Sequence, residues 1–304
     1  MVGRLVPAPS QIPQLVSRMS RINVSLPAER SGERLSQAAI CALIEEAELT
    51  PKPGLVDLAS NGSHADMDIE LMRRSAQSLT QTFREMAEVA FSQAPSQWLR
   101  ERLAAIGRAG ESMMLQATGG VNTHKGAIWA LGLLTAGAAI EGEDAAPALI
   151  AKTAGEIACF PDRWAPVGMT NGARVRQRYG VRGAAEEAKQ GFPHVISLGL
   201  PALQEARARG ASEVEARLDA LVALIASVDD TCILHRGGEE ALREAKKGAD
   251  AVMQAGGTST EAGRRALVRL DGLLTSRNAS PGGSADLLAA TLFLDRLHNL
   301  TGGV

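Results

Sequence analysis

Chemically capable side chains are concentrated in residues 45–72, EEAELTPKPGLVDLASNGSHADMDIELM. Pro51, Pro53 and Gly54 end a helix there, because proline lacks an N–H and favours extended geometry in the residue before it. The seventeen residues 52–68 hold one cation, three carboxylates, an imidazole and two small polar groups. In that order they are Lys52; Asp57, Asp66 and Asp68; His64; and Asn61 and Ser63. A plain connection needs turn formers but no such mixture of charges. We predict that this stretch forms one wall of an active site.

Acidic residues also occupy the last turn of the helix that precedes this stretch, namely Glu45, Glu46 and Glu48. The C-terminus is the negative end of a helix dipole, so carboxylates there are unfavourable. Either this helix end is solvated, or a cation or metal lies beside it.

The helix expected over residues 66–90 begins with two more acids. Asp66 is predicted as its N-cap and Asp68 falls in the first turn, where carboxylates are favoured. Helix capping explains the presence of only one of these two acids. It does not explain the presence of His64 just before them.

A second cluster is GGVNTHKG, residues 119–126. The glycine pair ends one helix and Asn122 or Thr123 can cap the next, which places His124 and Lys125 in the first turn. Free N–H groups and a lysine at a helix N-terminus suit an anion. The complete P-loop pattern is absent, and an ordinary helix start with a surface lysine is the alternative.

Two further clusters follow. Asp229 and Asp230 precede His235 and Arg236 by about one and a half helical turns, close enough for a shared site. Farther on, the Ser-Pro-Gly-Gly-Ser turn at 280–284 resembles a phosphate or ribose cradle, and its polar residues at the helix start are Ser280, Ser284 and Asp286.

The connection over residues 161–183 is predicted to be irregular. It is rich in arginine, and guanidinium groups match phosphate oxygens, so we interpret it as a phosphate-binding flap, with a solvated loop as the alternative. Its arginines are Arg163, Arg174, Arg176, Arg178 and Arg182.

Composition narrows the class of protein. The 304 residues are 45% hydrophobic and 22% charged, with a net charge of −2, which is typical of a globular protein. Near-zero charge and 3% aromatic residues give no indication of nucleic-acid binding. No apolar run reaches membrane-spanning length, and the three distant cysteines indicate buried free thiols in a reducing compartment. We therefore expect a cytoplasmic protein without a membrane partner.

Helix-forming residues and helical periodicity dominate the chain, and alternating strand patterns are lacking. The predicted fold class is all-α, a single compact multi-helix domain with at least nine helices. Residues 1–30 are predicted as an irregular N-terminal tail and residues 31–304 as an all-helical catalytic domain. The four polar clusters recur where helices start or stop, so clustered helix ends are expected to form one pocket. Its cations and carboxylates suit a nucleoside triphosphate with Mg²⁺.

These stretches carry a family resemblance. The segments PKPGLVD, GSHADMD, TGGVNTHKGAIWALG, GFPHV, DDTCILHRGG and SPGGSADLLAATLFL, in order across residues 33–298, resemble the triphosphoribosyl-dephospho-CoA synthase family. Within that family the chain is most similar to the branch associated with malonate decarboxylase rather than citrate lyase.

The resemblance implies a reaction in which ATP loses adenine. Its ribose C1 is attacked by the 2′-hydroxyl of 3′-dephospho-CoA, and the product is the precursor of the prosthetic group of an acyl carrier protein. Downstream partners would then be that acyl carrier protein and its phosphoribosyl-dephospho-CoA transferase. The oligomeric state stays open.

Glycosyl transfer requires a carboxylate that either stabilises an oxocarbenium-like centre or acts as base on the attacking hydroxyl. It also requires an acid or hydrogen-bond donor that helps adenine leave, and cations that hold the retained triphosphate. We assign the carboxylates to Asp66 or Asp68 with Glu46, directly or through Mg²⁺, and a second acidic group to Asp229 and Asp230. Proton relay is assigned to His64 or His124. Expected nucleotide contacts are Lys52, Asn122, Lys125, Arg182, Arg236 and Ser284; expected metal ligands are Glu46, Asp66 and Asp229.

Two other functions fit the same residues. One is an all-helical, Mg²⁺-dependent hydrolase of a nucleotide or ADP-ribosyl bond, with water as acceptor. The other is a non-catalytic module that carries a CoA derivative.

Overall fold

The computed structural model describes residues 12–166, 168 and 170–301, with side chains described for 26–299. The regular structure of these residues is entirely helical, which confirms the predicted all-α class. The helices are α1 (Ile12–Glu48), α2 (Ile69–Ser78), α3 (Thr80–Ala90), α4 (Gln97–Ala117), α5 (Lys125–Glu141), α6 (Pro147–Cys159), α7 (Asn171–Tyr179), α8 (Gly183–Lys189), the π-helical turn η1 (Val195–Gly199), α9 (Leu200–Ala208), α10 (Glu213–Ser227), α11 (Thr231–Gln254), α12 (Glu261–Ser276) and α13 (Gly282–Thr301).

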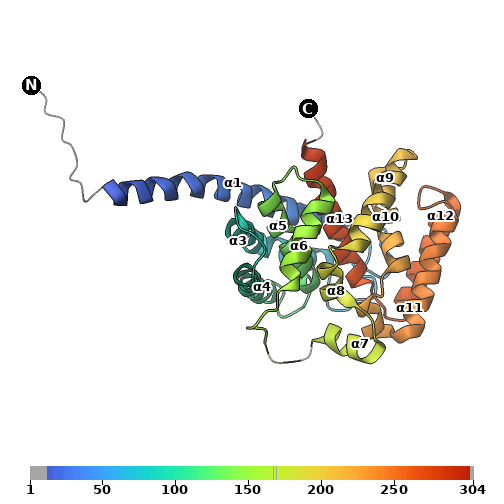
Figure 1. Ribbon diagram of the computed structural model, residues 1–304. Helices are drawn as coiled ribbons and strands as arrows, with labels where there is room; N and C mark the ends of the chain where they lie inside the picture. The colour runs from blue at the N-terminus through green and yellow to red at the C-terminus, as the bar shows by residue number, and fades with distance from the viewer. Residues whose placement is uncertain (1–11, 167, 169, 302–304) are drawn as a thin grey trace, which may run out of the picture.

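Helices α5 and α13 form the centre of the bundle, and the other helices surround them (Figure 1). Most of α5 is buried, because its sequence is apolar or small on every side. Leu131 and Leu134 of α5 and Phe293 of α13 are fully inaccessible to solvent. Because both helices are packed into the core, their N-termini have fixed positions. These N-termini lie at the pocket described below.

The expected irregular tail is wrong for residues 12–30, which belong to α1. The N-terminal part of this helix extends beyond the other helices (Figure 1). Pro13 falls in the first turn, where the missing N–H is not needed for helix formation. Residues 1–11 lie outside the described part of the chain.

The expected irregular connection over 161–183 is also partly wrong, because α7 occupies its middle. The Thr170 side chain accepts a hydrogen bond from Ala173 N, which caps the first turn, and Gly180 ends the helix in the left-handed conformation (φ +68°). Arg174, Arg176 and Arg178 therefore project from a helix rather than from a flexible flap.

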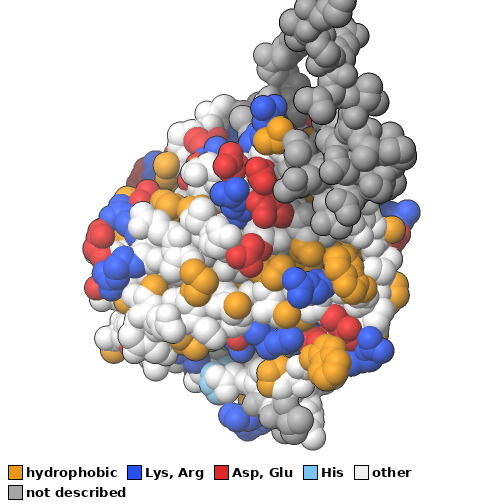
Figure 2. Space-filling model, turned by 90° about the vertical axis from the view of Figure 1, so that its left-hand side faces the viewer, with side chains coloured by type: hydrophobic (Ala, Val, Ile, Leu, Met, Phe, Trp, Pro, Cys, Tyr) orange, Lys and Arg blue, Asp and Glu red, His pale blue; other side chains and the backbone are white. Residues whose placement is uncertain are grey.

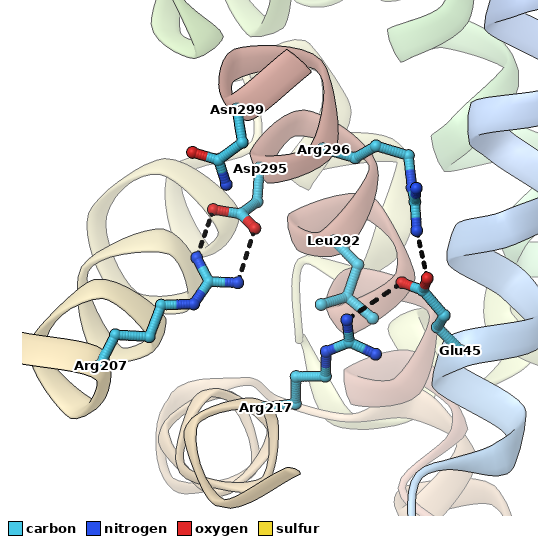
Figure 3. A pocket seen from close by; sticks show the side chains of 7 residues that line it. All are labelled: Glu45, Arg207, Arg217, Leu292, Asp295, Arg296 and Asn299. Carbon is cyan, nitrogen blue, oxygen red and sulfur yellow. Dashed lines mark hydrogen bonds and ion pairs between the residues drawn. The ribbon is translucent and has the colours of Figure 1, made fainter. Parts of the chain in front are cut away.

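The acidic end of α1 is neutralised by cations. Glu45 binds Arg217 of α10 and Arg296 of α13 in a small hollow of about 260 Å³, beside the bidentate pair of Arg207 with Asp295 (Figure 3). Glu48 accepts a hydrogen bond from Arg73 at 2.7 Å. Of the two interpretations of these acids, the nearby cation is confirmed.

The face of the molecule shown in Figure 2 mixes acidic, basic and apolar side chains, as its composition predicts. No helix among the described residues is long and apolar enough to cross a membrane. The three cysteines are free, but Cys159 is exposed and Cys41 and Cys232 are only partly covered, so their predicted burial is incomplete. Cys159 differs because it ends α6 at the surface.

Candidate active site

Helix ends converge on one large pocket of about 1330 Å³. Its walls come from the end of α1 with the loop after it, the N-termini of α5, α11 and α13, and the segment from α7 to η1. The predicted gathering of helix ends is thus confirmed. The segment from α7 to η1 is a further wall of the pocket, which the sequence had indicated by its arginines and by the GFPHV turn.

Glu46 and Lys52 form a buried ion pair in this pocket. Lys52 Nζ lies 2.6 Å from Glu46 Oε1 and also donates to the Glu46 carbonyl oxygen at 2.6 Å. Both side chains are almost inaccessible. The lysine therefore caps the C-terminal end of α1. Its charge is already neutralised by Glu46 when no anion is bound.

The loop after α1 is held by Asp57, which accepts hydrogen bonds from the backbone N–H groups of Lys52, Ala59 and Ser60 at 2.7–2.9 Å. This arrangement uses Asp57 as a loop organiser, and it presents the following residues to the pocket.

His64 lies between two walls of the pocket. Its Nε2 is 2.9 Å from Ser280 Oγ, and Arg236 Nη1 is 3.1 Å from its Nδ1. Burial and the Arg236 charge lower the pKa of His64. Arg236 also donates to the Ser63 carbonyl oxygen at 2.7 Å, so α11 is tied to the loop.

Asp66 and Asp68 lie apart from the pocket lining. Asp66 is exposed, with Oδ1 3.7 Å from His64 Nδ1. Asp68, not Asp66, is the N-cap of α2 and accepts a hydrogen bond from Leu71 N at 2.7 Å. The predicted cap position was wrong because α2 begins at Ile69, two residues later than the acids indicated.

His124 immediately precedes α5 and is 2% exposed. Its Nδ1 lies 2.6 Å from Ser75 Oγ, which lies 2.5 Å from Thr123 Oγ1. Its Nε2 is buried and has no hydrogen-bond partner. Burial, and secondarily the Lys52 charge, lower the pKa of His124 to about 4, so the imidazole is neutral at neutral pH.

Lys125 and Asn122 line the pocket beside His124. Lys125 Nζ pairs with Glu111 Oε2 at 2.7 Å, and its backbone N–H donates to Asn122 Oδ1 at 3.3 Å. The lysine is half exposed, so an incoming anion can compete for it. Arg182, at the start of α8, also lines the pocket and hydrogen-bonds Gln190 at 3.4 Å.

Asp230 joins two helices. Its carboxylate accepts hydrogen bonds from Cys232 N at 2.8 Å and Ile233 N at 3.4 Å on α11, and from Ser284 N at 2.8 Å and Ser284 Oγ at 3.0 Å on α13. Burial raises the pKa of Asp230, and this effect exceeds the lowering caused by the four hydrogen bonds. Ser284 is fully buried and lies outside the pocket lining. Its hydroxyl is therefore committed to Asp230 rather than presented to a nucleotide.

Asp286 is the carboxyl group that the sequence-based assignment missed. It lines the pocket just after the first turn of α13 and packs against Gly126 of α5, where an added Cβ would lie 1.9 Å from Asp286 Oδ2. Burial, with the charges of Glu46 and Asp230, raises the pKa of Asp286 well above its usual range. These surroundings favour the protonated form of the carboxyl group.

The three predicted metal ligands do not come together. Glu46 pairs with Lys52, Asp66 lies near His64, and Asp229 pairs with Lys246 at 2.6 Å. Across the described residues, no three His, Cys, Asp or Glu side chains form a group suited to a metal. The protein side chains thus do not fit the three-carboxylate metal site that we predicted.

Glu187 and His194 were also absent from the assignment, and both line the pocket. His194 Nδ1 lies 2.6 Å from Glu187 Oε2. The only sequence signal was GFPHV, whose glycine, proline and histidine mark an unusual turn.

The fold and the site define an all-helical protein with one large pocket, lined by charged side chains of both signs, at the N-termini of α5, α11 and α13. A family model described as CitG, ATP:dephospho-CoA triphosphoribosyl transferase, matches residues 32–303. The chain belongs to this family, and it is accordingly a transferase with ATP as the ribosyl donor.

Curated relatives extend over nearly the whole chain. One named probable 2-(5''-triphosphoribosyl)-3'-dephosphocoenzyme-A synthase, from Pseudomonas fluorescens (strain Pf-5), is 52% identical over 282 residues, covering 92% of this chain and 97% of the relative. The synthase of that name from Klebsiella pneumoniae is 51% identical over 272 residues, covering 90% and 97%. A probable synthase from Azotobacter vinelandii is 52% identical, covering 93% and 98%. No solved structure matches the chain.

Proposed function

We propose that this pocket joins the 5-triphosphoribosyl group of ATP to the 2′-hydroxyl of 3′-dephospho-CoA and releases adenine. The observation that carries the proposal is the Asp286 carboxyl group, which packs against Gly126 near the N-terminus of α5 and has a raised pKa. It lines a pocket larger than the roughly 300–1,000 Å³ typical of one small-molecule ligand. A pocket of this size has room for donor and acceptor together.

Asp286 is the group best suited to assist the departure of adenine. The breaking bond between ribose C1 and adenine leaves its electron pair on the base, which must then take up a proton. A carboxyl group whose neutral form is favoured by desolvation and by neighbouring carboxylates can supply one. Among the predicted acids, Asp66 and Asp68 lie outside the pocket lining.

The cations of the pocket would hold the triphosphate. Lys125 lies in the first turn of α5, and Arg236 of α11 also lines the pocket. The N–H groups of the first turn of α5 add to the attraction for an anion. Mg²⁺ would enter as part of the MgATP substrate, bound mainly by phosphate oxygens.

The product would pass to a transferase that attaches the group to an acyl carrier protein, and we propose the carrier of malonate decarboxylase. This part of the proposal rests on the similarity of the segments quoted above.

The experiment is incubation with ATP, Mg²⁺ and dephospho-CoA, followed by adenine chromatography and mass spectrometry of the coupled product. Adenine release that depends on dephospho-CoA is expected. Equal release without dephospho-CoA would show a hydrolase, and ATP binding without release would show a carrier module.

The Asp286→Asn protein tests the acid in the same assay. Asparagine keeps the size of the side chain but cannot donate a carboxylic proton, so a loss of about 10²-fold or more in kcat is expected. Asp250→Asn on the outer part of α11, which is exposed and outside the pocket lining, is the matched control. Equal kcat in the two variants would remove Asp286 from the mechanism.

A further inference from the structure

The turn that carries His194 has strained and unusual backbone geometry. Gly191 (φ +75°) is followed by Phe192 (φ +54°), a buried non-glycine residue in the left-handed region. Pro193 comes next, and the π-helical turn η1 starts directly after His194. Such strain costs about 1–3 kcal/mol per residue and, like π-helical turns, clusters at functional sites.

The surrounding helices hold this turn tightly in place. Gly155 of α6 lies against it so closely that an added Cβ would be 3.0 Å from Gly191 N and from the Ala188 carbonyl oxygen. On the other side of η1, a Cβ on Gly199 would lie 2.4 Å from Thr291 Oγ1 of α13. The position of His194 is thus determined by the bundle and not by an exposed loop.

Glu187 fixes the imidazole of His194 through two contacts. Its Oε1 accepts the backbone N–H of His194 at 2.9 Å, and its Oε2 lies 2.6 Å from Nδ1. The carboxylate therefore selects the tautomer with a proton on Nδ1 and leaves Nε2 as an acceptor. Glu187 is largely covered, whereas His194 is 30% exposed, so the ring remains accessible from the pocket.

The two histidines to which the sequence analysis assigned proton relay are less suited to accept a proton. The nitrogens of His64 are engaged by Arg236 and Ser280. His124, with a pKa of about 4, is a weak base, and base catalysis is most effective when the pKa of the base lies near the working pH.

We propose that His194 is the catalytic base for the acceptor hydroxyl and that Glu187 is its positioning residue. This assignment rests on the proposed function of the pocket. The 2′-hydroxyl of dephospho-CoA forms a bond to ribose C1 while its proton moves to His194 Nε2. The bond from C1 to adenine breaks with its electron pair on adenine, which takes a proton from Asp286. The imidazolium then returns one proton to solvent and Asp286 regains one, so the protons balance.

The test compares His194→Asn, Glu187→Gln and the control Glu186→Gln. Glu186 is the neighbouring acid on α8, pairs with Lys189 at 3.7 Å and lies outside the pocket lining. We expect His194→Asn to lower kcat by about 10²–10⁴-fold, with KM for both substrates changed less than about threefold. Glu187→Gln should lower kcat by at least tenfold, because an amide at this position favours the tautomer with a proton on Nε2. The control should retain wild-type kcat.

Chemical rescue separates a base from a structural residue. Added imidazole should restore part of the kcat of His194→Ala, with no effect on the wild-type protein or on Glu186→Gln. Circular dichroism and a thermal melt of each variant would establish folding; if His194→Ala is unfolded, the comparison of Glu187→Gln with Glu186→Gln decides.

Several results would overturn the assignment. These are wild-type kcat in His194→Asn, a defect confined to KM, or equal kcat in Glu187→Gln and its control. The wild-type protein, assayed in parallel, distinguishes this failure from the failure of the proposed function. If its adenine release did not depend on dephospho-CoA, the proposed function itself would be wrong.

Discussion

Asp286 occupies the space that a side chain at position 126 would fill: a Cβ on Gly126 would lie 1.9 Å from Asp286 Oδ2. The absence of a side chain at position 126 of α5 lets the N-terminal part of α13 approach this helix. Ala127 N–H, on α5, donates a hydrogen bond to the same carboxyl group. A glycine in the THKG segment thus determines where the proposed acid stands.

Gly126→Ala should displace Asp286 and lower both stability and activity. Overpacking of a filled site typically costs about 1–3 kcal/mol, measurable by urea unfolding, and kcat should fall with it. Gly272→Ala is the matched control, because Gly272 lies within α12 and an added Cβ would meet nothing within 4 Å. That substitution should leave kcat unchanged and stabilise the helix by about 0.5–1 kcal/mol. Equal effects of the two changes would contradict the close approach of α5 and α13.

Asp286→Asn should change how stability depends on pH. Folding raises the pKa of Asp286 well above its usual range. The stabilisation from its protonated form is therefore complete below the ordinary pKa of aspartic acid and is lost as the pH rises through the raised value. The asparagine variant, which does not titrate, should gain stability relative to the wild-type protein as the pH increases. Urea unfolding at pH 5, 7 and 9 measures this difference, and parallel pH profiles of the two proteins would contradict the raised pKa of Asp286.

His124→Gln should make the protein less sensitive to acid. Because folding lowers the pKa of His124 from 6.5 to about 4, its contribution is present above the unfolded value and is lost as the pH falls between these two values. The expected loss between pH 7 and pH 5 is roughly 2 kcal/mol from this residue. The glutamine variant should lack that part of the loss in unfolding experiments. An unchanged difference between pH 7 and pH 5 would place His124 in contact with solvent.

Lys52→Met should strongly destabilise the folded state, because it leaves the buried Glu46 carboxylate without its 2.6 Å partner. Breaking one side of a buried pair typically costs about 3–5 kcal/mol. The double variant Lys52→Met/Glu46→Gln removes both charges and should recover part of this loss. A double-mutant cycle in urea measures the coupling, and simple additivity of the two changes would contradict the buried pair.

The fold class and the gathering of helix ends could be predicted from sequence, because helical periodicity and clustered polar residues are local signals. The individual roles could not. Asp230 and Asp286 both stand near helix starts and both line the pocket. Only the packing of α11 on α13 shows that the Asp230 carboxylate caps α11 and also accepts hydrogen bonds from Ser284 of α13. The Glu187–His194 contact was equally hidden, because it depends on the strained turn between α8 and η1.

The shared cap at Asp230 also has an evolutionary consequence. One carboxylate serves the first turns of α11 and α13, and an added Cβ on Gly283 would lie 3.2 Å from both of its oxygens. Positions 230, 283 and 284 are therefore expected to vary together among relatives, although more than fifty residues separate the first from the others. A lineage that replaced the acid at 230 would have to find new partners for two helix ends at once, so this corner of the protein should be inherited as a unit.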